Sequence, residues 1–550
     1  MTTDHDTPSA EAALAAAWQG FSTGYRVLTE TELDVLCHKL LGHGPAAVAD
    51  RAARELRSYT ATVTAGPQPN RPPAVIMHSA TRTTRGFDGD LADVRAGRDP
   101  YDVAGYLEAR AVSLAAAGDL AVGRTQPWRD AVRHYGTDSL DVGLLEPYYL
   151  SDALLTVAAE TPRVLVPLVE WLRDRPSAVV RLYALDTETQ VFLLWLKAQA
   201  GLDALNVDAN NPVVSDRWNR KNHIHPTVED ALAITAVGLD ADALLQAEQR
   251  ASEAHRLLGL AVPVLPGYLV ERSASVAAFA DSVVEAARLL RERYGLEYGC
   301  LKPCEAGDGA RIVPGIALKN EETLRDHAVE AYQHGDAYLL EAHVDFLHCE
   351  IGGRRFIIAP SGHIRGGRVA AGLTLQLMNG VAWEGNVTLT ADDCARLGVP
   401  AEYHDRMTAA LNAVRNAFHG PRAAEQGCKG GLVTGGVDFA VGRIGGVFGD
   451  RVVLGAIDFN LSSHGAEYLR SFQDKVPGHV ATRVYRPASE ADLAATVTAV
   501  TGLAPDVATQ VVASVPGRWG MVAAAGTSLE DAARTAQRLV EGLRSLALAR

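Results

Sequence analysis

Three residues in one β-rich stretch have the types and spacing needed to bind a cation. Residues 431–460 read GLVTGGVDFAVGR, then IGGVFGD, then RVVLGAIDFN, so two apolar runs flank a glycine-rich loop and predict a β-hairpin. Side chains alternate along a strand, so Asp458 and Asn460 share a face, and Asp438 on the preceding strand can converge with them. Hard oxygen ligands suit Mg²⁺, which is usually shared with substrate phosphates. The alternative is that Asp458 and Asn460 begin a solvated loop. The cost of burying carboxylates on Val- and Ile-rich strands favours metal binding.

A second stretch, residues 298–313, has the features of a phosphate site. It reads YGCLKPCEAGDGARIV, and its short strand ends at Lys302-Pro303. A lysine at a strand end can reach phosphate oxygens as a point charge. Gly307 and Gly309 let backbone N–H groups approach a triphosphate closely. The competing interpretation is an ordinary surface hairpin.

Two arginines follow a further predicted hairpin. Residues 354–369 read RRFIIAPSGHIRGGRV, with an expected turn at Ser361-Gly362 and with Arg365 and Arg368 beyond it. An arginine fork can hold a carboxylate or an acyl phosphate through two parallel hydrogen bonds. Solvated arginines on a sheet edge are the alternative. Asn386, in the next apolar stretch, is a further candidate for a substrate contact.

An acid and a basic loop complete the candidate set. In residues 338–351, YLLEAHVDFLHCEI, an apolar strand runs directly into Glu341, and His348 and Glu350 occupy alternate positions that share a face. Either of those two could equally be a partly exposed sheet residue. Upstream, SDRWNRKNHIHP at residues 215–226 contains Lys221, and is either a ligand-binding loop or a basic solvated loop.

Length and composition limit the class of protein. The 550 residues are too many for one core and predict three or four domains. The net charge of −14 disfavours non-specific nucleic-acid binding, which needs positive charge to displace counterions. The six cysteines lack a paired metal-type spacing and are interpreted as reduced thiols of a cytosolic protein. The N-terminus lacks the basic segment of a signal peptide, and no apolar run is long enough to cross a bilayer. We therefore expect a cytoplasmic location and no membrane partner.

The hairpin at residues 431–460 resembles the metal-binding end of the ATP-grasp superfamily. Asp438 matches the acid of that family's first strand, and Asp458 and Asn460 match its E/D-x-N pair. The K-P strand and glycine loop of residues 298–313 lie upstream in the family's order, which favours the phosphate site over a surface hairpin. The resemblance covers roughly residues 212–550. One departure is Leu461-Ser462, which stands where many members carry Pro-Arg.

The resemblance implies roles for the other candidates. Glu341 and the hinge backbone at Val344 would bind the adenine amino group, while His348 and Glu350 would serve the ribose, as in the carboxylase-like branch. Lys221, rather than Arg217, would join Lys302 on the phosphates. Arg365 or Arg368 would hold the acyl phosphate, with His464 and Lys319 as the next candidates.

The expected fold class is α/β and α+β, in four parts. Residues 1–100 are expected to be a mainly helical extension, and residues 101–225 a Rossmann-like α/β domain with a strand at 178–185 and a helix at 187–200. Residues 226–475 would form a two-part ATP-grasp domain whose lid covers about 260–345. Residues 476–550 would form a small α+β piece with strands at 481–485 and 520–525.

The resemblance implies an ATP-dependent carboxylate–amine ligase with two Mg²⁺ ions, or Mn²⁺ as a substitute. Such an enzyme forms an amide or peptide bond through an acyl phosphate. The chain looks similar to the amino-acid and peptide ligases of bacterial natural-product (antibiotic) pathways, including the pheganomycin-type peptide ligases. Its partners would be small-molecule carboxylates and amines, and a homodimer is compatible with this. Three alternatives stay open: a carboxylase-type enzyme, an ATP-binding regulatory protein without turnover, and an unrelated α/β protein with a structural metal.

Overall fold

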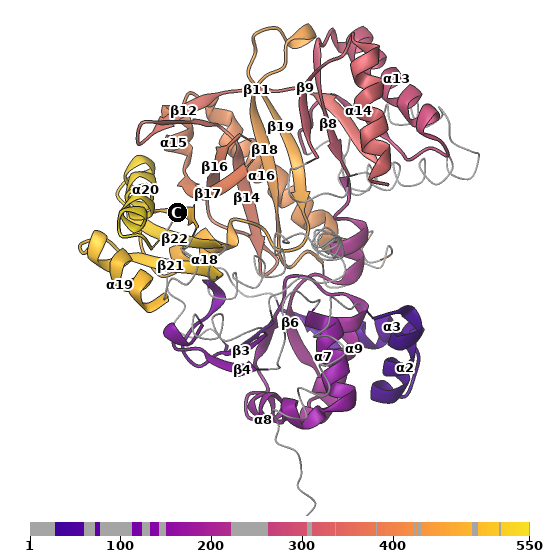
Figure 1. Cartoon of the computed structure of the whole chain (residues 1–550), viewed down its shortest axis with the longest axis vertical. Coiled ribbons are helices and arrows are strands. Elements are labelled where there is room, and N and C mark those ends of the chain that lie inside the picture. The colour runs from indigo at the N-terminus through magenta and orange to yellow at the C-terminus, as the bar shows by residue number, and fades with distance from the viewer. Residues whose placement is uncertain are drawn as a thin grey trace, which may run out of the picture.

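The computed structural model describes residues 28–59, 72–77, 113–123, 132–141, 150–221, 262–304, 311–335, 337–380, 382–421, 425, 431–486, 493–515 and 519–548. The rest of the chain, including Gly307 and Gly309, lies outside this described part. Within it, the predicted α/β and α+β class is confirmed: a parallel sheet with helices precedes two antiparallel sheets (Figure 1).

The N-terminal unit is built on a six-stranded, all-parallel sheet. Its strand order is β1-β6-β5-β2-β3-β4. The strands are β1 (Leu56–Ser58), β2 (Ala74–Ile76), β3 (Leu120–Gly123), β4 (Asp138–Asp141), β5 (Val179–Arg181) and β6 (Leu205–Asp208). The helical elements are α2 (Glu30–Leu41), η1 (Pro45–Ala47), α3 (Val48–Glu55), α7 (Leu150–Glu160), η2 (Pro162–Leu165), α8 (Val166–Arg173), α9 (Thr187–Ala200) and the π-turn η3 (Val213–Arg217).

The boundary expected at residue 100 does not separate two cores. Strands β1 and β2 lie inside the same sheet as β3–β6, and one apolar cluster runs from Leu28 to Ala209. The first hundred residues therefore contribute strands to the α/β unit, in addition to helices α2 and α3. The sequence predicts a short strand at Ala74–His78, which corresponds to β2, whereas β1 is only three residues long and directly follows α3, so its period-2 signal is hidden.

Helix α9 shows how local sequence fixes an element. It spans Thr187–Ala200, the range that the sequence predicts. The side chain of Asp186 accepts a hydrogen bond from the Thr189 amide at 2.7 Å, which satisfies a free donor of the first turn. Gly201 ends the helix in the left-handed conformation with φ of 70°.

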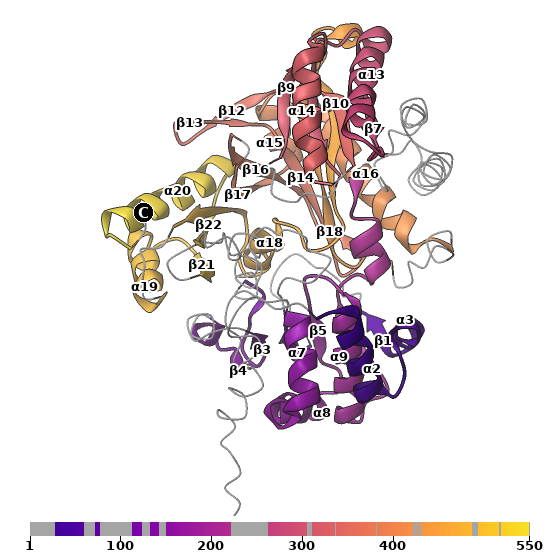
Figure 2. The ribbon, with the colours of Figure 1, turned by 45° about the vertical axis from the view of Figure 1, so that its right-hand side comes forward.

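The second unit is a four-stranded antiparallel sheet covered by two long helices. The order is β7-β10-β8-β9, with β7 (Gly267–Val270), β8 (Tyr298–Pro303), β9 (Val313–Ala317) and β10 (Tyr338–Ala342). Helices α13 (Val276–Tyr294) and α14 (Glu321–Gln333) pack on it through one apolar cluster (Figure 2). These elements lie in the region where the lid was expected.

The third unit is a ten-stranded sheet. Its main path is β11-β18-β14-β16-β17-β20-β22-β21, with β15 on β14 and β19 on β18. The strands are β11 (Asp345–Phe346), β14 (Pro360–Arg365), β15 (Arg368–Val369), β16 (Leu373–Asn379), β17 (Ala382–Leu389), β18 (Gly435–Arg443), β19 (Val453–Asn460), β20 (His479–Tyr485), β21 (Thr509–Val515) and β22 (Trp519–Gly526). A separate hairpin pairs β12 (His348–Ile351) with β13 (Arg354–Ile357). The helical elements are α15 (Ala391–Arg396), α16 (Ala401–His419), η5 (Gly446–Phe448), α18 (Glu467–Gln473), α19 (Leu493–Leu503) and α20 (Leu529–Ser545).

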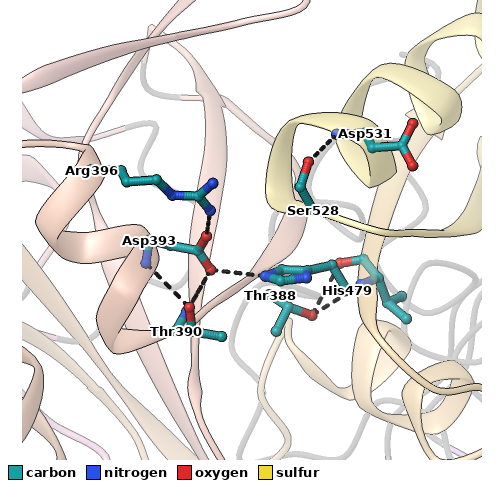
Figure 3. Close-up of polar contacts among 8 residues, drawn as sticks. Thr388, Thr390, Asp393, Arg396, His479, Ser528 and Asp531 are labelled. Atoms are coloured by element: carbon teal, nitrogen blue, oxygen red, sulfur yellow. Dashed lines mark hydrogen bonds and ion pairs between the residues drawn. The ribbon is translucent and has the colours of Figure 1, made fainter.

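The C-terminal strands belong to this sheet and do not form a sheet of their own. Val387 of β17 pairs with Ala481 of β20, so β20–β22 extend the ten-stranded sheet. The polar side chains of Figure 3 reinforce the connection. The carboxylate of Asp393 accepts hydrogen bonds from Thr390 and His479, and the hydroxyl of Thr388 accepts one from the Val480 amide at 3.1 Å.

No helix in the described part of the chain is both long enough and apolar enough to span a bilayer.

Candidate functional site

The predicted hairpin brings the three candidate metal ligands together. Strands β18 and β19 are antiparallel neighbours, with Asp438 directly opposite Asp458 and Asn460 opposite Gly436. Residues opposite each other on paired strands share a face, and so do residues two apart on one strand. The Asn460 side-chain amide accordingly donates to Asp438 Oδ2 at 3.1 Å. Two carboxylates and an amide therefore lie on one face of a two-stranded unit.

His464 adds a ring to this group. The Ala466 amide donates to His464 Nδ1 at 3.1 Å, so Nδ1 is an acceptor and the proton of a neutral ring sits on Nε2. Nε2 lies 3.0 Å from Asp438 Oδ1 and donates to it. The ring also stacks on His363, with centroids 5.9 Å apart. His464 thus orients one of the two hairpin carboxylates.

Two lysines form ion pairs with acidic side chains of the site. Lys221 Nζ lies 2.7 Å from Asp458 Oδ1, and Lys302 Nζ lies 2.5 Å from Glu341 Oε1. Lys302 also donates to the backbone oxygen of Ile457, the residue before Asp458, at 2.7 Å. Lys221, Lys302 and Glu341 are buried and Asp458 is partly buried. These four residues come from four separate segments of the sequence, and they lie next to one another in the folded chain.

The register of the second sheet explains why Lys302 meets Glu341. Leu339 of β10 is opposite Lys302 of β8, and Glu341 lies two residues further along β10. The two side chains therefore occupy a diagonal position on one face, within reach of each other. Gly267 of β7 is opposite Glu341, and a Cβ there would lie 2.8 Å from the Glu341 Cβ. Glycine leaves the room that this acid needs.

Burial and ion pairing have opposite effects on the pKa values of these charged side chains. Burial raises the pKa of Glu341, although Lys302 opposes the shift. At Asp458 burial also disfavours the charged form, but the Lys221 ammonium prevails and holds the pKa below its usual range. Burial disfavours the Lys221 ammonium as well, and Asp458 more than compensates, so its pKa is raised. Lys221 and Asp458 therefore stabilise each other as a charged pair.

Of the two candidate arginines, one is enclosed and one is exposed. Arg365 and Arg368 face each other across a tight turn whose central residues, Gly366 and Gly367, both have positive φ. Arg365 Nη1 lies 2.9 Å from Glu467 Oε1, and the same carboxylate lies 3.0 Å from His363 Nε2. Arg368 is exposed. The turn expected at Ser361-Gly362 is wrong, since both residues lie inside β14.

The remaining candidates are placed as follows. Val344 is buried between β10 and β11. His348 and Glu350 share the exposed face of β12, in the separate β12–β13 hairpin. Asn386 is buried and its side chain donates to Thr374 Oγ1 at 3.1 Å, so it has a structural partner. Gly307, Gly309 and the side chain of Arg217 lie outside the described part of the structure.

Asn210 is a site-positioning residue that the sequence did not reveal. Its fully buried amide donates to the backbone oxygens of Thr434 and Leu461 at 2.7 and 2.6 Å. Its Oδ1 accepts from the amides of Val433 and Thr434 at 2.6 and 3.0 Å. Asn210 thereby fixes the start of β18 and the end of β19 to the N-terminal unit. The neighbouring N and P residues made it look like an ordinary turn asparagine.

The donor set fits Mg²⁺ better than a metal that prefers a closed protein cage. Among the described residues, no three His, Cys, Asp or Glu side chains gather as a metal cluster. Asp438, Asp458 and Asn460 supply two carboxylates and one amide oxygen. Mg²⁺ typically takes one or two carboxylates and completes its shell with water and substrate phosphates. Two lysines beside these carboxylates are what a polyphosphate ligand requires.

Neither a protein-family model nor a curated protein matches the chain. Among solved structures, it is similar to N5-carboxyaminoimidazole synthase from Aspergillus clavatus with ADP and 5-aminoimidazole ribonucleotide. The two chains are 11% identical, the match covers 86% of this chain and 99% of the other, and the TM-score is 0.42. The biotin carboxylase domain of Hydrogenobacter thermophilus 2-oxoglutarate carboxylase is 12% identical, with 83% of this chain and 87% of that chain covered and a TM-score of 0.40. D-cycloserine synthetase is 14% identical, with 72% of this chain and 93% of that chain covered and a TM-score of 0.29.

Proposed function

We propose that this chain is an ATP-grasp enzyme that joins a carboxylate to an amine at the expense of ATP, with an amino acid or small peptide among its substrates. One observation carries the proposal: the buried ion pair Lys302–Glu341 adjoins the pair of buried Lys221 with partly buried Asp458, beside Asp438 and Asn460. Buried charges of both signs are expensive unless they serve a ligand or each other. The set matches, in kind, what MgATP needs.

The chain's own residues divide the work. Lys221 and Lys302 would neutralise the phosphate oxygens, and Asp438, Asp458 and Asn460 would hold Mg²⁺, or Mn²⁺ in its place. When bound, the metal would supply positive charge that neutralises the phosphate oxygens of ATP. Glu341 and the backbone near Val344 would bind the adenine. Arg365 would hold the acyl phosphate as it forms, because its guanidinium lies on the same sheet beyond His464 and His363.

The reaction needs no protein nucleophile. A carboxylate oxygen attacks the γ-phosphorus, the bond to the β-phosphate oxygen breaks, and ADP leaves. The amine then attacks the acyl carbon, phosphate leaves, and the amine proton passes to water. Positioning and electrostatic stabilisation are the protein's contribution, as in other phosphoryl transfers.

The test is ADP release screened against amino acids and dipeptides, with hydroxylamine as a trap. We expect ADP to form only with a carboxylate present, and a hydroxamate to form without any amine substrate. Asp458→Asn should reduce both at least about 100-fold while keeping an oxygen for Lys221. Asp450→Asn, in the exposed turn of the same hairpin, is the matched control.

Other results would redirect the proposal. ADP release that depends on bicarbonate alone would indicate a carboxylase. ATP-induced thermal stabilisation without turnover would indicate a regulatory protein, and no response to ATP would leave only a structural metal at the hairpin. Wild-type turnover in Asp458→Asn would remove the basis of the site.

A further inference from the structure

A recess outside the candidate site is lined by three arginines. It lies between the β12–β13 hairpin and helix α20, which are neighbours in both views (Figures 1 and 2). Its polar lining consists of Arg354, Arg483, Arg534 and Gln537, and Phe356 forms part of its apolar wall.

The recess is on the opposite side of the ten-stranded sheet from the candidate site. Ala481, Arg483 and Tyr485 are two residues apart along β20, so they share one face of the strand. Ala481 and Tyr485 pack in the same apolar cluster as α20. Val480 faces the other way, into the cluster of α18, the helix that carries Glu467. The lysines and carboxylates described above therefore take no part in the recess.

The recess carries an excess of positive charge. Arg354 Nη2 and Arg483 Nη2 both bind the same oxygen, Glu384 Oε2, at 3.2 and 2.5 Å. The other oxygen of Glu384 accepts from Asn379 at 3.0 Å. One carboxylate thus serves two guanidiniums, and Arg534 on the rim is a third cation. Each guanidinium keeps its charge at any ordinary pH, so the excess cannot be relieved by deprotonation.

Arg483 is buried and incompletely bonded. Its side chain is only 5% exposed, yet its Nε and Nη1 atoms have no hydrogen-bond partner among the described residues. Its guanidinium and that of Arg354 lie 5.7 and 5.2 Å from the centroid of the Phe356 ring. Burial lowers the pKa of Arg483, with Glu384 opposing and Arg354 adding repulsion. Buried donors without acceptors are costly, and an anion at the recess removes that cost.

We propose that this recess binds a small oxyanion, an inorganic phosphate or a carboxylate group, held by Arg354, Arg483 and Arg534. Planar guanidinium forks match the oxygens of both groups. Gln537 is already bonded, because its amide nitrogen donates to Glu541 at 2.9 Å and its oxygen accepts from Arg354 at 3.4 Å. Such an anion joins the hairpin to the C-terminal helix, because Arg354 belongs to β13 and Arg534 to α20. The site is independent of ATP and of ligase turnover.

The experiment is calorimetric titration of the full-length protein with sodium phosphate and, separately, acetate, against sodium chloride at matched ionic strength. Arg534→Gln should weaken phosphate binding on the order of fivefold, since an exposed guanidinium contributes less than a buried one. Arg538→Gln is the matched control: Arg538 is one turn further along α20, exposed, and not part of the lining. Arg354→Gln is a second variant in the hairpin, and its effect should match that of Arg534→Gln.

The comparison also separates two binding places. Phosphate held by Lys221 and Lys302 would be unaffected by Arg534→Gln, so a loss confined to Arg534 and Arg354 variants identifies the recess. Equal phosphate affinity in wild type, Arg534→Gln and Arg354→Gln would overturn the proposal. So would a wild-type protein that responds to phosphate no more than to chloride. A failed ligase assay leaves either result readable, because no turnover is involved.

Discussion

At the scale of single residues, Lys221 forms an ion pair with Asp458, the carboxylate that a metal ion would need as a ligand. Its ammonium lies 2.7 Å from Asp458 Oδ1, and the pair is stabilised in its charged form. A divalent ion that arrives alone has to displace this lysine and leave it without a partner. Phosphates that arrive with the metal give Lys221 a new anion. We therefore expect metal and nucleotide to bind together.

The first residue-scale prediction is that Lys221→Met lets the metal bind alone. Titration of the nucleotide-free protein with Mn²⁺, followed by calorimetry, should give an affinity on the order of tenfold higher in the variant, because one pairing energy no longer has to be broken. ATP affinity should fall in the same variant.

Lys39→Met, which removes an exposed lysine of α2, serves as the control and should change neither affinity. Tight Mn²⁺ binding by the nucleotide-free wild type would show that Lys221 does not block the metal.

The second residue-scale prediction separates the two arginines. Arg365→Ala should depress hydroxamate trapping far more than ATP binding, since a fork that pairs with charge on the transferred phosphoryl group acts mainly in the transition state. The barrier should rise by about 2–4 kcal/mol. Arg368→Ala, across the same turn but exposed, should leave trapping nearly unchanged. If the two variants trap equally well, the cation lies elsewhere, with His464 as the next candidate.

From residue types and spacing alone, we could predict that two side chains of the candidate site lie close together only when both belong to the same hairpin. Asp438, Asp458 and Asn460 lie on one hairpin, so period-2 alternation was enough. Glu467 and His363, which enclose Arg365, come from a helix and a strand more than a hundred residues apart. No local pattern relates such residues, and a lone buried histidine carries no periodic signal.

At the scale of elements, β14 shows why a glycine misled the prediction of a turn. Gly362 sits inside the strand, where a Cβ would lie 2.0 Å from Leu411 Cδ1 of α16. This glycine therefore permits a close approach of strand and helix. The turn is made by Gly366-Gly367, with φ of 55° and 69°, a conformation that favours glycine at both positions. Sequence alone does not distinguish these two uses of glycine.

The element-scale prediction concerns the contact between β14 and α18. Burial lowers the pKa of His363 from 6.5 to about 4, with Glu467 opposing. The folded state therefore binds fewer protons than the unfolded state between these values. Neutral His363 therefore contributes to the free energy of unfolding in full above pH 6.5, and this contribution is lost as the pH falls toward 4. The loss is about 3 kcal/mol for this one group.

Guanidinium denaturation at a series of pH values measures this change. In His363→Gln the free energy of unfolding should fall less steeply from pH 6.5 to 4 than in wild type, because one titrating group is gone. His38→Gln, at an exposed histidine of α2, should keep the wild-type slope. Identical slopes in wild type and His363→Gln would mean that this histidine does not titrate differently in the two states.

At the scale of the whole molecule, the boundaries were harder to predict than the class. The alternation of strands and helices indicated α/β and α+β architecture, and helix α9 was predicted residue for residue. The sequence did not show that β20–β22 extend the ten-stranded sheet, because a single described pair, Val387 with Ala481, connects β17 to β20. Strand partners far apart in sequence are set by tertiary packing, to which local propensity is blind.

The whole-molecule prediction is that Asn210 connects the folding of the N-terminal unit to that of the candidate site. Its one amide satisfies four backbone groups at the start of β18 and just after β19, all buried. Asn210→Ala leaves these groups without partners, so the free energy of unfolding should fall by at least about 3 kcal/mol. Because Leu461 follows Asn460 directly, the hairpin carboxylates should also lose their fixed position, and metal affinity should fall with stability.

Denaturation measures only the total loss of stability in Asn210→Ala, whereas hydrogen exchange shows where in the structure the loss occurs. Amides of Val433 and Thr434 should exchange much faster in Asn210→Ala, while amides in the middle of β18 change less, since their ladder bonds to β14 and β19 persist. Asn206→Ala is the matched control, because Asn206 lies in β6, four residues before Asn210, and its described side-chain bond is one of 3.5 Å to Ala178 within the N-terminal unit. Equal protection at residues 433 and 434 in the two variants would show that the units are held together by their apolar contacts and not by Asn210.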